Sequence, residues 1–255
     1  MLSETYSIIL ALLAAGAAGL VGAFALMKKT VLAGDVMSHV AIPGLGLAMM
    51  WQINPLFGGA LTLFIGALII SRLERKTSLS SDAAIGVIFA GSVALGALLI
   101  NSKEELIDAL FGGFGGLSMN EFIFGVVSSL LIVVSLWILR NKLIINLFSG
   151  ELAAAAGINI GRLNFWFLLL FSLSILLGLR FLGALLAGAL IIVPASAARQ
   201  FTHGLGSFLI CSILFSVLSM MAGFAISSAY GLELGPTVVM VAAAIFALSL
   251  LKKKE

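Results

Sequence analysis

The chain is dominated by long apolar runs separated by short polar stretches. Most runs are about as long as the 20 residues that an α-helix needs to cross roughly 30 Å of hydrocarbon. They lack the alternation over about ten residues that marks the strands of a membrane β-barrel. The pattern therefore predicts an all-α polytopic membrane protein with about nine transmembrane helices, at roughly residues 6–27, 35–50, 55–72, 83–100, 121–139, 164–179, 182–198, 205–229 and 236–251.

The distribution of lysine and arginine supports this count. With nine spans, one set of alternate ends holds twelve basic residues and the other holds two, Lys103 and Arg180. Cytoplasmic loops carry an excess of basic residues, so we expect the amino terminus outside and the carboxyl terminus in the cytoplasm. Eight spans with one re-entrant segment would also fit the pattern.

Composition excludes a soluble enzyme. The chain is 62% hydrophobic and only 10% charged, whereas soluble domains carry about 25% charged residues. With loops this short, residues 1–255 are expected to form a single transmembrane domain. Cys211 is the only cysteine, which excludes an intrachain disulfide. The net charge of +3 is attributed to membrane orientation, and no nucleic-acid partner is expected.

Two loops exceed the minimum length. Residues 101–120 fall outside and combine acidic residues with a glycine-rich stretch. Residues 140–163 fall inside, and their alanine-rich part favours a short helix, with Ser149 as its cap and Gly157 as its stop. That helix would either dock a partner or serve as an interfacial connector, and both readings stay open.

Asp35 and His39 are the strongest candidates for chemistry. They lie four residues apart at the start of a span, so on a helix they share one face. A carboxylate and an imidazole suit a divalent transition metal, and two ligands suit transient binding. Two copies of the chain could surround one ion with two of each. Alternatively, Asp35 caps the helix or pairs with Lys29, and His39 only packs. Pro43 just beyond should loosen the helix.

The sequence carries no nucleotide-binding or hydrolase motif. It has no Gly-x-x-x-x-Gly-Lys-[Ser/Thr] phosphate loop, no Gly-x-Ser-x-Gly elbow and no His-Glu-x-x-His pair. We therefore expect a transporter subunit rather than an enzyme. If transport is driven by ATP, another subunit hydrolyses it. A secondary carrier, with Asp35 and His39 relaying protons, is the alternative.

Six motifs, in order, resemble the permease subunits of bacterial ABC importers for zinc, manganese or iron. They are Gly34–Gly46 (GDVMSHVAIPGLG), Asp82–Phe89 (DAAIGVIF), Leu110–Gly113 (LFGG), Glu151–Asn159 (ELAAAAGIN), Gly183–Arg199 (GALLAGALIIVPASAAR) and Gly235–Thr237 (GPT). The resemblance runs over nearly the whole chain.

This resemblance implies the partners and roles of an importer in the cell membrane. Two permease copies would work with two cytoplasmic ATPase subunits and an extracytoplasmic metal-binding protein, with no permanently bound cofactor. Asp35 and His39 match the residues thought to line the ion path. Glu151, Ala154 and Gly157 match the helix that couples to the ATPase. The binding protein could dock on residues 101–120.

Overall fold

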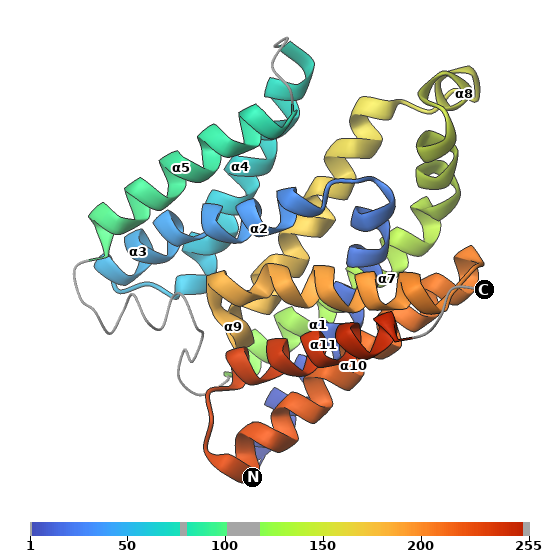
Figure 1. Ribbon diagram of the computed structural model, residues 1–255. Helices are drawn as coiled ribbons and strands as arrows, with labels where there is room; N and C mark the ends of the chain where they lie inside the picture. Colours follow the sequence, from blue (N-terminus) through green and yellow to red (C-terminus); the bar gives the residue numbers. More distant parts are fainter. Residues whose placement is uncertain (1, 77–80, 101–117, 252–255) are drawn as a thin grey trace.

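The computed structural model describes residues 2–76, 81–100 and 118–251; of residues 2–4, 31–35, 74–76, 81–85 and 184–186 it describes only the backbone. The described chain is helical throughout and contains no strand (Figure 1). Its helices are α1 (Leu2–Met27), α2 (Val31–Val40), α3 (Ile42–Met50), α4 (Pro55–Lys76), α5 (Ser81–Leu99), α7 (Met119–Phe148), α8 (Gly150–Ala155), α9 (Ile160–Phe201), α10 (Leu205–Tyr230) and α11 (Leu234–Leu250).

The apolar helices account for the nine predicted spans. Five stretches in the described chain are long and apolar enough to cross a membrane, namely Thr5–Met27, Pro55–Leu73, Met119–Phe148, Ile160–Gly183 and Leu205–Tyr230. Four shorter apolar stretches correspond to the other spans: Val36–Met50, Gly86–Leu99, Ala187–Phe201 and Leu234–Leu250. The fold is therefore that of an all-helical polytopic membrane protein.

Helix α9 supplies two of the spans because it reverses at Gly183. A straight helix of its 42 residues would be about 63 Å long, twice the thickness of the hydrocarbon core. Gly183 has φ 71° and ψ 176°, a region that is essentially restricted to glycine. A Cβ built on Gly178 would lie 3.1 Å from the Cβ of Ala187, so the arms on either side of the turn pack together. The sequence prediction of a span boundary near residues 180–181 is confirmed.

Helix α7 extends further than the sequence analysis indicated. Residues 140–163 were expected to leave the predicted span as a loop with a short helix, but α7 continues unbroken to Phe148. No glycine or proline interrupts residues 126–148, so polar residues such as Asn141 and Lys142 extend the helix instead of ending it. The short alanine-rich helix follows as α8.

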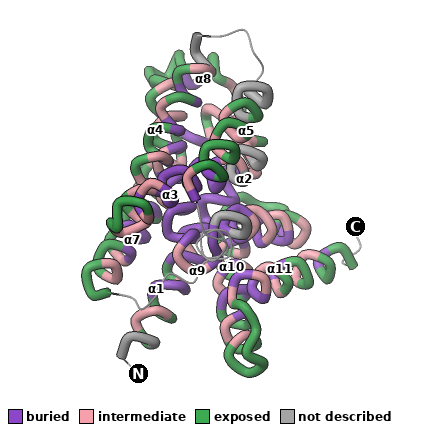
Figure 2. The backbone as a smooth tube through the Cα atoms, turned by 90° about the vertical axis from the view of Figure 1, so that its left-hand side faces the viewer, coloured by how far each residue is buried: buried purple, intermediate pink, exposed green. Residues whose placement is uncertain are grey.

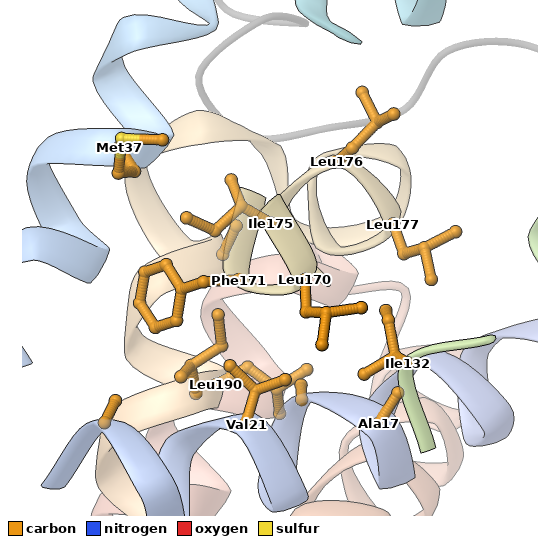
Figure 3. Packing of buried hydrophobic residues seen from close by; sticks show 14 of the residues in the cluster. Ala17, Val21, Met37, Ile132, Leu170, Phe171, Ile175, Leu176, Leu177 and Leu190 are labelled. Carbon is orange, nitrogen blue, oxygen red and sulfur yellow. The ribbon is translucent and has the colours of Figure 1, made fainter. Parts of the chain in front are cut away.

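The core lies where α1 packs against α9 and α10. Most of α1 is buried, and its small residues allow close approach of its neighbours. The Ser212 hydroxyl of α10 donates a 2.6 Å hydrogen bond to the carbonyl of Gly19 on α1. Figure 2 shows the buried positions concentrated in the middle of the molecule. Figure 3 shows side chains of α1 (Ala17, Val21) meeting those of α7 (Ile132) and α9 (Leu170, Phe171) there.

Candidate functional site

The helix that carries His39 is interrupted just after it. Helix α2 ends at Val40, and α3 starts at Ile42 with Pro43 in its first turn. In a continuous helix the carbonyl of His39 would accept the N–H of residue 43, which proline lacks. The N–H of Ala41 approaches that carbonyl instead. Ala41 itself keeps helical angles, φ −71° and ψ −27°, so Pro43 removes a hydrogen bond without turning the chain out of its helical course. The sequence predicted such a loosening beyond the Asp35–His39 pair.

The position of α3 beyond the break is fixed by a glycine contact with α4. A methyl group built on Gly44 would overlap the carbonyl of Gly58, and one built on Gly58 would overlap the carbonyl of Gly44. The two backbones are therefore in direct contact, which only glycine permits at both positions. This contact anchors the segment that follows the break.

The imidazole of His39 lies between α2 and α5. Only 9% of the residue is exposed. Its ring meets the ring of Phe89 on α5 edge to face, with 4.9 Å between centroids. The Ser38 hydroxyl lies 3.4 Å from the Nδ1 atom of His39, a long distance for a hydrogen bond. His39 is therefore a buried residue at a helix interface, where polar side chains need partners.

Asp35 lies on α2 one turn before His39, but its side chain is outside the described residues. The backbone confirms that both positions share a helix and a face. Among the side chains that the structure describes, no three of His, Cys, Asp and Glu gather to hold a metal ion. Within one chain, the backbone therefore brings together Asp35 and His39, the pair that the sequence predicted.

Helix α8 has the cap and the stop that the sequence predicted. The Ser149 hydroxyl accepts a 3.2 Å hydrogen bond from the N–H of Leu152. Gly157, at φ 74°, follows the last turn. Ala153 is fully buried, whereas Glu151, Ala154 and Gly157 are exposed. Figure 1 shows α8 at the tip formed by the end of α7 and the start of α9. Helix α8 lies between the apolar stretches that end at Phe148 and begin at Ile160, and most of its residues are exposed.

A polar cluster at the opposite end of the bundle was missed by the sequence analysis. The Glu121 carboxylate accepts a 2.7 Å hydrogen bond from the Asn54 amide and lies 3.8 Å from the Arg180 guanidinium, both charged side chains being largely buried. Glu121 and Ser118 also form a capping box at the start of α7. Two signals could have predicted the cluster: the Ser-x-x-Glu pattern, and opposite charges at the same predicted end of the bundle.

At the end of the bundle that contains α8, a lysine ties α1 to α9. Lys28 donates a 2.7 Å hydrogen bond to the side-chain oxygen of Asn164 and lies 4.7 Å from the centre of the Phe167 ring. The contact holds the last turn of α1 against the first turns of α9. Lys28 was predicted to lie at the basic end, and the helix order places it there.

Comparisons with known proteins identify relatives over almost the whole length. Residues 5–253 match the ABC 3 transport family. The chain is 32% identical over 238 residues to the high-affinity zinc uptake system membrane protein ZnuB of Haemophilus influenzae, covering 92% of this chain and 91% of that protein. It is 28% identical to the manganese transport system membrane protein MntC of Listeria innocua, covering 91% and 84%.

A solved structure has the same fold. PsaBC from Streptococcus pneumoniae, in complex with Fab, superposes with a TM-score of 0.87 at 25% identity, covering 99% of this chain and 92% of the matched one. This match and the helix inventory confirm the predicted fold class. The family match confirms the predicted resemblance and the expectation of a membrane transport subunit rather than an enzyme. The chain belongs to the ABC 3 transport family.

Proposed function

We propose that this chain is the membrane permease of a binding-protein-dependent ABC importer for zinc or manganese, with Asp35 and His39 as ligands on the ion path. The whole chain, residues 1–255, would act as one transmembrane permease domain. The family match supports the transporter class, and relatives named for zinc and manganese transport support the substrate class.

The observation that carries the ligand assignment is the buried imidazole beside a helix break. Ionisable side chains in a membrane are costly and usually face a pathway or a partner. His39 is buried immediately before a position where Pro43 withholds a backbone donor. Its carbonyl could thus supply an oxygen ligand beside the imidazole. A second copy of the chain would complete the coordination set with its own Asp and His.

The partners follow from the same proposal. Helix α8, with Glu151, Ala154 and Gly157, would transmit the motion of a cytoplasmic ATPase, because it presents an exposed surface at one tip of the bundle. An extracytoplasmic metal-binding protein would deliver the ion at the opposite end. The basic residues whose side chains are described support this orientation. Arg180 lies at the opposite end, beside Glu121, whereas seven lie in the part of their helix or turn that faces α8: Lys28, Lys29, Arg72, Arg140, Lys142, Arg162 and Arg199.

Metal uptake by cells that express the complete importer tests the ligand assignment. Asp35→Ala and His39→Ala are compared with the wild type at equal membrane expression, with zinc, manganese and iron offered separately. Loss of even indirect supports of metal ligands lowers affinity by about 10–100-fold. Removing a direct ligand should therefore lower uptake of one ion by at least about tenfold.

His203→Ala is the matched control, because His203 is exposed in the turn between α9 and α10. It should leave uptake unchanged. Normal uptake of all three ions by the Asp35 and His39 variants would reject the ligand assignment. A loss of ATPase co-purification in these variants would instead indicate a defect of assembly.

A further inference from the structure

Two cavities follow the contact between α4 and α9. The first has a volume of about 350 Å³ and lies where α4 ends and α9 begins, lined by Leu68, Ser71, Arg72, Asn159, Arg162 and Phe165. The second has a volume of about 260 Å³ and is lined mainly by apolar residues of α4, α7 and α9, including Phe64, Leu131 and Trp166.

The two cavities adjoin one another. On α4, Leu68 lines the first cavity and Phe64 the second, so their linings are about one turn, or 5.4 Å, apart. On α9, Phe165 lines the first and its neighbour Trp166 the second. Since the linings follow one another along both helices, we treat the two cavities as one surface with a basic end and an apolar body, which we call the α4–α9 groove.

The chemistry of the basic end suits a phosphate group. Arg72 and Arg162 are exposed and have no ionic partner among the described residues. Ser71 is only 8% exposed, and its hydroxyl finds no hydrogen-bond partner in the part of the chain that the structure describes. Guanidinium groups bind phosphate through paired hydrogen bonds. The first turn of α9 adds the positive end of its helix dipole.

The apolar body suits a hydrocarbon chain. Phe64, Leu131 and Trp166 are 46%, 50% and 51% exposed, and all three belong to stretches that are apolar enough to cross a membrane. A surface of this kind, which the chain's own helices leave exposed at membrane depth, suits contact with lipid. A molecule that presents both a phosphate and an acyl chain, at the depth of a helix end, is a phospholipid.

We propose that the α4–α9 groove is a binding site for an anionic phospholipid, with the phosphate held by Arg72 and Arg162 and one acyl chain lying against Trp166. Its assignment to the cytoplasmic leaflet rests on the orientation proposed above. The binding itself is independent of which metal is transported, so the proposal can fail without affecting the permease function.

Quenching of Trp166 fluorescence by lipids brominated on the acyl chain tests the proposal. Trp51, Trp137 and the tryptophans of the partner subunits are replaced by phenylalanine. The complete importer is then reconstituted in phosphatidylcholine with increasing brominated phosphatidylglycerol. Each guanidinium near an anionic headgroup contributes about fivefold to affinity. Arg72→Gln together with Arg162→Gln should therefore weaken binding of the brominated phosphatidylglycerol by about 25-fold.

Matched variants separate this site from the general lipid surface. Trp137 is 60% exposed with Arg140 at 4.3 Å, and it lines neither cavity. A chain with Trp137 as its only tryptophan should show no such dependence on Arg72 and Arg162. Arg72→Lys with Arg162→Lys retains the charge and should keep most of the binding. Normal co-purification of the ATPase by the glutamine variant shows that this variant is folded.

Several outcomes would overturn the proposal. One is equal quenching of Trp166 by brominated phosphatidylglycerol and brominated phosphatidylcholine. Another is arginine-dependent thermal stabilisation by inorganic phosphate without any lipid preference, which would indicate a free-phosphate site. A third is loss of ATPase co-purification in the glutamine variant with lipid quenching unchanged, which would assign the arginines to that protein interface.

Discussion

At the scale of single residues, the most consequential position after His39 is Pro43. Its effect is exerted through the backbone: it lacks the N–H that would continue the helix through the carbonyl of His39. A proline in this position favours a segment that can change shape. The same residue therefore weakens the helix locally. The His39 carbonyl keeps its contact with the Ala41 N–H, and its second lone pair stays available beside the imidazole.

Pro43→Ala is expected to make the helix continuous. Restoring the backbone donor removes an interruption that costs about 3 kcal/mol in a regular helix, so the thermal midpoint of the purified protein should rise or stay unchanged. Metal uptake should fall, because the His39 carbonyl then accepts a hydrogen bond from the N–H of residue 43 and is no longer free to bind the ion. Thermal unfolding in detergent and uptake in cells measure the two effects, and unchanged uptake would contradict the role of the break.

Gly183→Ala should destabilise the protein by about 1–3 kcal/mol, because alanine is strained in the backbone conformation of this turn. Thermal unfolding measures the effect. Gly206→Ala is the control, since a Cβ there meets no atom within 4 Å and the position is helical. Equal midpoints for the two variants would show that the turn accommodates a side chain.

At the scale of elements, the apolar runs sufficed to predict the helices, whereas several of their ends depended on features beyond hydropathy. The start of α8 was predicted because Ser149 caps it locally, and its end because Gly157 can adopt a positive φ. The end of α7 was missed because polarity alone does not terminate a helix. The contact of Glu121 with Arg180 was missed because the residues are far apart in sequence.

The spacing of Asp35 and His39 sufficed to propose them as a pair. The residues that surround the pair could not be predicted from the sequence. The position of Phe89 against His39 depends on how α5 packs on α2, and packing of distant segments leaves no signature in a single sequence. The groove between α4 and α9 is another product of packing. In the sequence, Arg72 and Arg162 are explained by the excess of basic residues in cytoplasmic loops, and nothing there indicates that they lie close together.

Leu152→Asp on α8 should weaken the association with the ATPase and lower ATP-dependent uptake. Leu152 is 62% exposed, and a carboxylate placed in an apolar contact resists desolvation. Co-purification of the ATPase and transport in reconstituted vesicles measure the effect. Leu251→Asp is the control, because Leu251 is 79% exposed at the end of α11. Equal co-purification by both variants would exclude α8 as the coupling surface.

At the scale of the whole molecule, polar contacts tie the helices together at both ends. Lys28 joins α1 to α9 at the basic end, while Glu121 joins α7 to α4 and α9 at the opposite end. Between them lies an apolar core rich in small residues. The arrangement fixes the ends of the bundle while leaving α2 and α5 on one side, where the candidate ligand lies.

Removing one member of the Glu121–Arg180 pair should be worse than replacing both. Glu121→Ala leaves a largely buried guanidinium without its carboxylate, and such changes cost about 3–5 kcal/mol. The double variant Glu121→Leu with Arg180→Met avoids that buried charge and should be more stable than Glu121→Ala. Thermal unfolding of the three proteins measures the difference. A double variant less stable than the single one would show that the pair is not coupled in this way.

The turn at Gly183 also constrains how the chain enters the membrane during synthesis. The second arm of α9 runs from Ala184 to Phe201, about 18 residues or about 27 Å, close to the thickness of the hydrocarbon core. Only Gly183 leaves the helical conformation between the two arms, so no loop separates them. Because so tight a turn keeps the arms in contact at Gly178 and Ala187, we expect them to enter the lipid together, as one helical hairpin.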